Sequence, residues 1–318
     1  MWAALALVVA GSALLYGGAH VLIRGASGLA RAFGVAPAVV GLTVVAFGTS
    51  LPELAVTITA ALGGNADIAL GNVVGSNIAN MGLILGLATL VRGLSVEFTL
   101  LRREVPMGLA AVVLVAVLSA DGMLGRADAV LLLAAFAGFL YWSVAVERRA
   151  PGEVQARYER VHASGARKGL LAGMAVAGLA GVLVGGRWLV EGGVAAAALL
   201  GVPPVIVGLT LVAVGTSLPE LAATLVAAAR GEDDISVGNV LGSNLFNLLG
   251  ILGVACLLDP IAVSRSFFSL QYPVLAVFTV ALFPICRTGM GISRREGALL
   301  LTGYFVYVSV LYFGGVGG

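Results

Sequence analysis

The sequence predicts an all-α polytopic membrane protein, with ten transmembrane helices arranged as two inverted five-helix repeats. Three observations support this fold class: an apolar composition, ten stretches long enough to cross a bilayer, and a block of forty residues that occurs twice. Hydrophobic residues make up 60% of the 318 residues and charged residues 11%, whereas roughly a quarter of the residues in soluble proteins are charged. The lipid bilayer is therefore expected to be the solvent of this chain.

The ten apolar stretches account for most of the chain. A helix needs about 20 apolar residues to cross a hydrocarbon core of roughly 30 Å. The stretches lie near 2–23, 36–62, 68–91, 105–120, 127–147, 169–190, 203–229, 235–258, 269–286 and 296–314. A polar segment, 151–168, separates the fifth stretch from the sixth, and we interpret it as a cytoplasmic linker between two domains, 1–150 and 169–318.

The positive charges predict the orientation, because Lys and Arg accumulate in short cytoplasmic loops. With the N-terminus outside, fifteen of the eighteen Lys and Arg residues fall in inner loops. Both termini are then expected outside. A net charge of +2, without basic runs interleaved with aromatic residues, gives no indication of a nucleic-acid partner. No feature indicates an obligate protein partner.

The two halves are copies of each other. Residues 41–80 align without a gap to residues 208–247, at a constant offset of 167, and 26 of the 40 positions are identical. Because each half contains five spans, an odd number, the second copy must enter the membrane from the opposite side. Inverted repeats of this kind are typical of secondary transporters, whose substrate site lies near the midplane where the copies meet.

The duplicated motif "GTSLPE" places a carboxylate, Glu53 or Glu220, about midway along the second and seventh stretches. A charge at that depth costs a few kcal/mol and is expected only opposite a partner, a cavity or an ion. The adjacent prolines, Pro52 and Pro219, lack an N–H and should make both helices discontinuous. We expect them to free the carbonyls of Ala46, Thr49, Ala213 and Thr216 from the helical ladder.

These freed carbonyls, the two carboxylates and four motif hydroxyls predict an all-oxygen cage. The hydroxyls are those of Thr49, Ser50, Thr216 and Ser217. Oxygen ligands are the set that hard cations such as Ca²⁺ and Na⁺ prefer. A membrane-embedded Glu can also be the structural partner of an Arg, but neither span contains Lys or Arg, which favours the ion site.

A second duplicated motif, "GNVxGSNxxN", follows in the third and eighth stretches. Its polar side chains repeat every four residues and so share one face of a helix: Asn72, Ser76 and Asn80 in one half, and Asn239, Ser243 and Asn247 in the other. We expect this face to line the cage, although such residues also serve as interhelical hydrogen bonds. Asp67 and Asp234 precede the two motifs, where we expect helix N-caps.

The two paired motifs resemble the alpha-repeats of the cation/calcium exchanger superfamily, in particular its sodium/calcium exchanger branch in prokaryotes. The resemblance implies antiport of Na⁺ and Ca²⁺ across the plasma (inner) membrane, without a cofactor and without enzymatic activity. It implies that Ca²⁺ binds between Glu53, Glu220 and the carbonyls of Thr49 and Thr216. It implies Na⁺ sites built from Ala46, Ser50, Ser76 and Glu53 in one half and from Ala213, Ser217, Ser243 and Glu220 in the other, with Asn80 and Asn247 at central polar positions.

One position separates this chain from some members of the superfamily, including potassium-dependent exchangers, which have Asp where this chain has Asn247. With Asn, the cage holds two negative charges, which argues against K⁺ co-transport. The resemblance further implies that the first and sixth spans slide to alternate access.

Alternative functions are an H⁺/Ca²⁺ antiporter of the same superfamily and a cation channel. Proton-coupled members typically place an acid within the "GN" motif, where this chain has Gly-Ser in both copies. A channel would not need inverted duplication. An enzyme is disfavoured, because neither an HExxH nor a GxSxG motif occurs.

Overall fold

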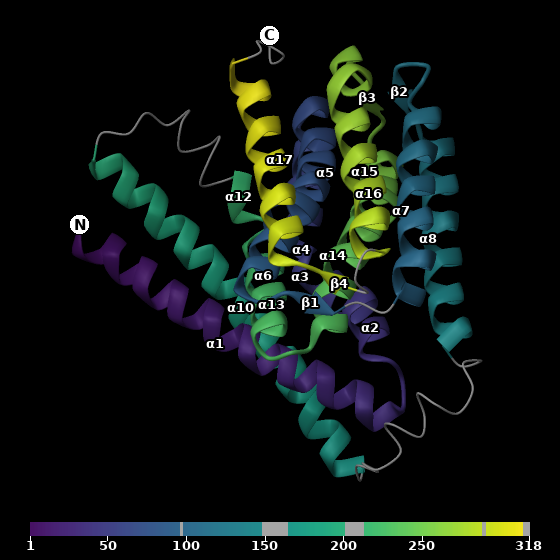
Figure 1. Cartoon of the computed structure of the whole chain (residues 1–318). Helices are drawn as coiled ribbons and strands as arrows, with labels where there is room; N and C mark the ends of the chain where they lie inside the picture. The colour runs from purple at the N-terminus through teal and green to yellow at the C-terminus, as the bar shows by residue number, and fades with distance from the viewer. Residues whose placement is uncertain (96–97, 148–164, 201–212, 288–290, 314–318) are drawn as a thin grey trace.

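The computed structural model describes residues 1–95, 98–147, 165–200, 213–287 and 291–313, and within them the chain is almost wholly helical (Figure 1). The first half comprises α1 (Trp2–Phe33), α2 (Pro37–Val40), the π-helix η1 (Gly41–Val45), α3 (Ala46–Thr49), α4 (Leu51–Leu62), α5 (Ala66–Ala79), the π-helix η2 (Asn80–Ile84), α6 (Leu85–Val91), β1 (Leu94–Ser95), α7 (Phe98–Leu118), β2 (Met123–Leu124) and α8 (Arg126–Glu147). The second half comprises α10 (Gly165–Leu199), α12 (Ala213–Gly215), α13 (Leu218–Ala229), α14 (Asp233–Leu245), the π-helix η4 (Phe246–Ile251), α15 (Leu252–Leu258), β3 (Ile261–Ala262), the π-helix η5 (Phe267–Gln271), α16 (Tyr272–Arg287), β4 (Gly291–Ile292) and α17 (Arg294–Phe313).

Two long helices, α1 and α10, pack against each other and cross the other helices obliquely (Figure 1). Glycines spaced seven apart let their backbones touch: Gly11, Gly18 and Gly25 on α1, and Gly178, Gly185 and Gly192 on α10. A Cβ atom on Gly18 would lie 2.6 Å from the backbone nitrogen of Val182, and one on Gly178 would lie 2.2 Å from that of Leu22. Any larger residue would therefore force the pair apart.

The centre of the molecule consists of two continuous helical spans, Ala66–Val91 and Asp233–Leu258. They contain the duplicated "GNVxGSNxxN" motif, and each includes a short π-helical segment, η2 or η4. The other helices surround them, so that 78% and 89% of their apolar windows are buried. Polar residues of the motif consequently lie in the interior, where they need partners.

The span that carries the first "GTSLPE" motif is broken, as predicted. Helical segments Pro37–Thr49 and Leu51–Leu62 meet at Ser50 with a bend of 47°. In the second half, Thr216 and Ser217 form a turn between α12 and α13. Each motif proline is the second residue of the helix after the break, where its missing N–H has no helical partner to lose.

Six helices are long and apolar enough to cross a membrane, or seven if the bent pair counts as one span, among the described residues. Two more, α7 and α17, contain 21 and 20 residues. Residues 203–212 of the expected seventh span and 151–164 of the expected linker lie outside the described residues. The ten-span inverted arrangement stays a prediction. The fourth span was predicted to begin at 105, but its helix begins at Phe98, because the helix continues into charged residues beyond the apolar stretch.

Two short antiparallel sheets join the halves. Strand β1 pairs with β4, aligning Leu94 with Ile292, and β2 pairs with β3, aligning Leu124 with Ile261. Each sheet takes one strand from each half, and β1 and β3 occupy positions 167 residues apart, as the duplicated blocks do. This reciprocal pairing indicates that the two halves are related by approximate two-fold symmetry.

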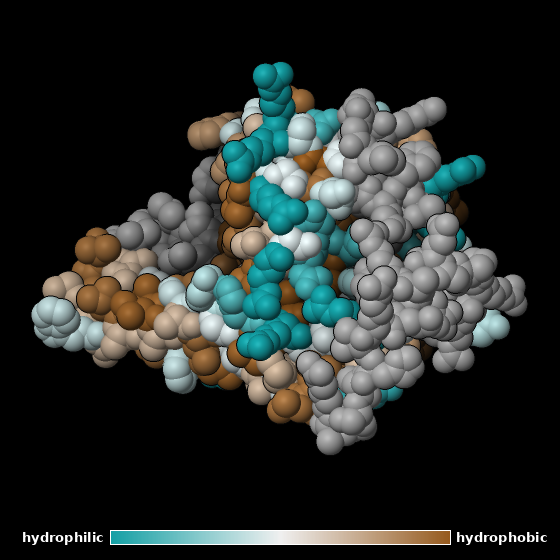
Figure 2. Space-filling view, turned by 60° about the horizontal axis from the view of Figure 1, so that its bottom comes forward, coloured by the Kyte–Doolittle hydropathy of each residue, from teal (hydrophilic) through white to brown (hydrophobic). Residues whose placement is uncertain are grey.

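The sides and ends of the helix bundle differ in polarity. Large apolar side chains are exposed along its sides, including Val9, Val117, Val130, Val277, Leu299 and Phe305, which is typical of a lipid-facing surface. Figure 2, which turns the bottom of Figure 1 forward, shows hydrophilic residues running down the middle of that end. Ion pairs Arg31–Glu232 (3.5 Å) and Arg92–Asp233 (3.6 Å) link helices at their polar ends.

Candidate cation-binding site

The two motif carboxylates meet between the halves of the molecule. Glu53 and Glu220 lie in the first turns of α4 and α13, and each is 1% exposed. The Ser50 hydroxyl donates to Glu220 Oε1 (2.7 Å), and the Ser217 hydroxyl donates to Glu53 Oε1 (2.9 Å). Each serine thus binds the carboxylate of the other half, although the carboxylate of its own half lies only three residues away in the sequence.

The second oxygen of each carboxylate has no partner. Glu53 Oε2 and Glu220 Oε2 are buried and accept no hydrogen bond, and no described Lys or Arg forms an ion pair with either residue. An unsatisfied buried acceptor costs about 1–3 kcal/mol, and more when it is charged. A bound cation would relieve this cost for both carboxylates.

The motif threonines differ between the halves. The Thr49 hydroxyl lies within 3.3 Å of the carbonyls of Val45 and Ala46 and of Asn239 Oδ1, whereas Thr216 Oγ1 is buried without a partner. The expectation that the Ala46 carbonyl is freed was wrong: it accepts the Ser50 N–H at 3.1 Å, because the chain stays helical through α3. The side chain of Ala213 lies outside the described residues.

Asn72 and Asn239 tie α5 and α14 to the helices that carry the carboxylates. The Asn72 amide donates to the Thr57 hydroxyl (2.9 Å) and to the Glu53 carbonyl (3.2 Å). Asn239 donates equivalently to the Thr224 hydroxyl (2.9 Å) and to the Glu220 carbonyl (3.5 Å). Their N–H₂ donors thus fix the turns that present the glutamates, and the expectation that this helix face lines the cage stays a prediction.

Four asparagines form a reciprocal network across the two central spans. Asn77 Nδ2 donates to the Asn244 carbonyl (3.1 Å), and Asn244 Nδ2 donates to the Asn77 carbonyl (3.4 Å). Asn80 Nδ2 donates to Asn244 Oδ1, and Asn247 Nδ2 donates to Asn77 Oδ1, both at 3.0 Å. Sequence analysis missed Asn77 and Asn244, although their repetition at the offset of 167 was a signal for them.

This network orients the central polar residues. Asn80 and Asn247 each donate an N–H to an asparagine of the other half. Their Oδ1 atoms are buried and accept no hydrogen bond. Both lie in π-helical turns, which are frequent at functional sites. Ser76 and Ser243 are also buried, and the Ser243 hydroxyl has no partner.

The unpartnered atoms of the site share one chemistry. They are Glu53 Oε2, Glu220 Oε2, Asn80 Oδ1, Asn247 Oδ1, Thr216 Oγ1 and Ser243 Oγ. All are oxygens, and they come from both halves. Buried polar atoms are normally hydrogen-bonded, so this group points to ligands of a hard cation.

Comparisons with known proteins agree with this chemistry. The family model described as "Sodium/calcium exchanger protein" matches residues 3–145 and 170–313. The chain belongs to the sodium/calcium exchanger family. It is 36% identical over 318 residues to the inner membrane protein YrbG of Escherichia coli, covering 98% of both chains, and 32% identical over 345 residues to the sodium/calcium exchanger MaX1 of Methanosarcina acetivorans, covering 96% and 98%.

A solved structure of the sodium-calcium exchanger NCX_Mj superposes on this family member with a TM-score of 0.86 at 32% identity, covering 97% of this chain and 99% of that one. The sodium/calcium exchanger family comprises membrane transporters rather than enzymes. The resemblance seen in the sequence motifs is therefore confirmed at the level of family and fold.

In this exchanger-family chain, the helix α10 packs directly onto both motifs. A Cβ atom on Gly48 would lie 2.6 Å from Leu179 Cδ2, and one on Gly215 would lie 2.5 Å from Val190 Cγ2. The motif glycines therefore allow α10 to approach the turns that carry the glutamates. Any movement of α10 would therefore change the packing of these turns.

The predicted N-caps were each misplaced by two residues, because the N-cap positions are Asn65 and Glu232. Helix α5 begins at Ala66 and α14 at Asp233, so Asp67 and Asp234 lie inside the first turn. Their carboxylates still complement the positive end of the helix dipole, but they are not the capping residues.

Proposed function

We propose that this protein exchanges Na⁺ for Ca²⁺ across a membrane, by alternating access to the site between Glu53 and Glu220. The observation that carries the proposal is the pair of buried carboxylates, one from each half, each with one oxygen unpartnered. Membership of the sodium/calcium exchanger family and similarity to NCX_Mj support these two ions as substrates.

The proposed ligands are those that the family resemblance implies, and they include the unpartnered oxygens of Glu53, Glu220, Asn80, Asn247 and Ser243. Ca²⁺ would bind the carboxylates of Glu53 and Glu220 together with the carbonyls of Thr49 and Thr216. Na⁺ would use the same carboxylates with flanking groups, which are Ala46, Ser50, Ser76 and Asn80 in one half and Ala213, Ser217, Ser243 and Asn247 in the other. Ser50 and Ser217 donate to the carboxylates, and each hydroxyl oxygen would still have a lone pair to offer a bound cation.

Charge counting supports exchange rather than co-transport. Two carboxylates neutralise one Ca²⁺, and the same oxygens cannot hold Ca²⁺ and several Na⁺ at once. An exchange of three Na⁺ for one Ca²⁺ would move one net charge per cycle, worth roughly 2.3 kcal/mol per 100 mV. Transport would then be electrogenic.

The packing of α1 and α10 supports them as the moving element. Their glycines interlock the two backbones, so the pair would move as one body over the rest of the bundle. The full proposal places ten spans in two inverted halves joined by residues 151–168, with both termini outside a prokaryotic plasma membrane. The polar end shown in Figure 2 would face the cytoplasm.

A proton/calcium antiporter is the second candidate, because two closely placed buried carboxylates could also carry protons. Reconstituted protein separates the candidates. Proteoliposomes loaded with Na⁺ should take up radiolabelled Ca²⁺ when diluted into Na⁺-free buffer, whereas an H⁺ or K⁺ gradient alone should not drive uptake. Glu53→Gln and Glu220→Gln should each abolish this uptake, with the exposed Glu191→Gln as a control for loss of a carboxylate. Full uptake by either site variant would refute the proposed site.

A further inference from the structure

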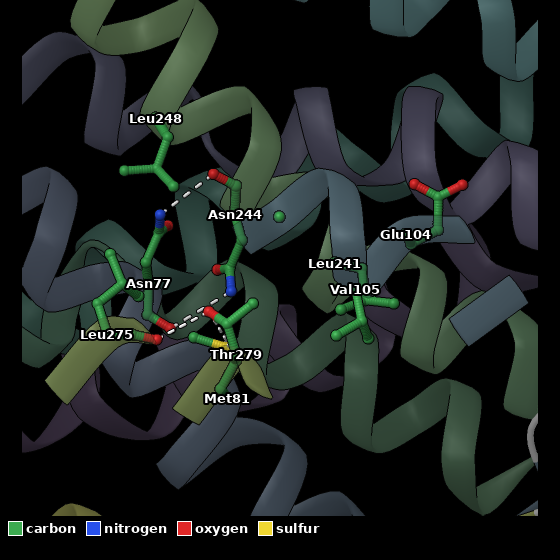
Figure 3. A pocket seen from close by; sticks show the side chains of 10 residues that line it. Asn77, Met81, Glu104, Val105, Leu241, Asn244, Leu248, Leu275 and Thr279 are labelled. Atoms are coloured by element: carbon green, nitrogen blue, oxygen red, sulfur yellow. Dashed lines mark hydrogen bonds between the residues drawn. The ribbon is translucent and has the colours of Figure 1, made fainter. Parts of the chain in front are cut away.

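Asn77 and Asn244 lie opposite each other where the two central spans meet, and both are buried (Figure 3). The Asn77 Nδ2 atom donates to the main-chain carbonyl of Asn244 (3.1 Å), and the Asn244 Nδ2 atom donates to the main-chain carbonyl of Asn77 (3.4 Å). A main-chain carbonyl can only accept a hydrogen bond. Each side chain must therefore turn its nitrogen toward the opposite backbone, which leaves its oxygen for another partner.

This polarity is passed on to Asn247 and Asn80. Asn247 Nδ2 donates to Asn77 Oδ1, and Asn80 Nδ2 donates to Asn244 Oδ1, both at 3.0 Å. Because an amide oxygen can only accept, Asn247 and Asn80 must each present an N–H to the network. Their own Oδ1 atoms are buried and accept no hydrogen bond. Two main-chain carbonyls thus decide which atom of each central amide is left free.

Among the described residues that line the small cavity beside the asparagines, no other polar group competes for these amides. The polar members of the wall are Asn77, Asn244, Thr279 and Glu104. The Thr279 hydroxyl donates to a main-chain carbonyl of its own helix (2.8 Å). Glu104 is 4% exposed, and its carboxylate points away from both asparagines, with apolar side chains between them (Figure 3). The orientation of the central amides therefore depends on the asparagines themselves.

We propose that Asn77 and Asn244 are positioning residues for Na⁺, which keep the Oδ1 atoms of Asn247 and Asn80, rather than their N–H₂ groups, available to the ion. The inference rests on the proposed function, in which Na⁺ uses these two oxygens and Ca²⁺ uses the carboxylates and the threonine carbonyls. An amide that turned over would replace a cation ligand with N–H donors, whose positive ends repel a cation. Loss of this control should weaken Na⁺ binding and spare Ca²⁺ binding.

The hydrogen bonds assign each positioning residue to one central amide. Asn77→Leu removes the acceptor of Asn247. The Asn244 side chain still donates to the main-chain carbonyl of residue 77 and still accepts from Asn80. Effects of substitutions at Asn77 and Asn247 should therefore not add, because one residue acts through the other, whereas effects at Asn77 and Asn80 should add.

The test compares Na⁺ binding with Ca²⁺ binding. The full-length protein in detergent micelles is titrated with each ion alone, with N-methylglucamine keeping the ionic strength constant, and half-saturation is read from the rise of the thermal unfolding midpoint. Asn77→Leu should raise the half-saturating Na⁺ concentration about tenfold, the equivalent of one lost hydrogen bond, and change that of Ca²⁺ by less than about twofold. Thr279→Val alters the same cavity wall outside the network and is the matched control, which should leave both values unchanged.

The same titration is then made in two variant backgrounds. In Asn247→Leu protein, Asn77→Leu should cause no further weakening of Na⁺ binding. In Asn80→Leu protein, it should still cause its full effect. A residue that only supports the fold would not distinguish between these backgrounds.

Three results would overturn the inference: unchanged Na⁺ binding in Asn77→Leu, equal weakening of Na⁺ and Ca²⁺ binding, or a full effect of Asn77→Leu in the Asn247→Leu background. If the Leu variant does not fold, Asn77→Ala, which adds no bulk between the spans, takes its place with the same expectations. A wild-type midpoint that does not respond to Na⁺ would refute the proposed function together with the inference. A wild-type response to both ions, with any of the three results above, would count against the inference alone.

Discussion

Replacing Ser217 with alanine should destabilise the ion-free protein through a carboxylate that belongs to the other half of the chain. The Ser217 hydroxyl donates to Glu53 Oε1 at 2.9 Å, and both groups are buried. Glu53 Oε2 is already unpartnered, so the substitution leaves both oxygens of this carboxylate without a donor. The spacing in the sequence would instead suggest that Ser217 acts on Glu220, three residues away.

A double-mutant cycle isolates this contact. A hydrogen bond to a charged group is worth about 1.5–3 kcal/mol, so Ser217→Ala and Glu53→Ala should show a coupling energy of that size. The same serine variant combined with Glu220→Ala should show a clearly smaller coupling, because no hydrogen bond joins the two side chains. Cavity costs of each single variant cancel within the cycle.

The measurement is the apparent free energy of unfolding by denaturant titration in detergent micelles, in buffer free of Na⁺ and Ca²⁺. The reciprocal cycle of Ser50→Ala with Glu220→Ala tests the symmetric contact at 2.7 Å. A coupling of Ser217 to Glu220 that equals or exceeds its coupling to Glu53 would refute the crossed arrangement. Saturating Ca²⁺ should reduce the coupling, because the ion takes over the carboxylate oxygens.

Three further predictions concern movement and voltage. Gly18→Ala should lower thermal stability and Ca²⁺ uptake, since its Cβ would lie 2.6 Å from a backbone nitrogen of α10, whereas Gly17→Ala, with nothing within 4 Å, should behave as wild type. A disulfide between Ser27→Cys and Glu232→Cys, whose side chains are hydrogen-bonded, should arrest uptake by fixing α1 to the start of α14; uptake should return with reductant, and uptake that persists despite complete cross-linking would contradict the movement. An inside-negative potential should slow Ca²⁺ uptake driven by internal Na⁺, because one net positive charge leaves when three Na⁺ are exchanged for one Ca²⁺; an uptake rate that does not depend on the potential, or that rises with it, would contradict the three-to-one cycle.

Much of the site was accessible from the sequence. Glu53 and Glu220 were identifiable because a carboxylate is rare in an apolar span and because both recur at the same offset. The break near Ser50 followed from Pro52 and the small residues around it. These features are local, and an offset alignment of the chain with itself is sufficient to find them.

Other contacts and residues were missed for a physical reason. The sequence did not show that the Asn72 amide donates to Thr57 and to the Glu53 carbonyl, because these contacts depend on the packing of α5 on α4. Asn77 was not singled out, because its importance depends on Asn244 approaching from the other half. Glu104 was not noticed, because it stands beside two arginines at the edge of an apolar stretch.

By itself, the sequence determined that the chain is a duplicated membrane protein with two paired carboxylates, because composition, span length and repetition are properties of the chain read in order. The tertiary structure decided which hydroxyl serves which carboxylate, how the asparagines bridge the halves, and that Glu104 lines a cavity. Those outcomes depend on contacts between side chains about 140 to 170 positions apart, such as Ser50 with Glu220 (170 apart) and Asn80 with Asn244 (164 apart). Only the packing of one half against the other brings such groups within hydrogen-bonding distance.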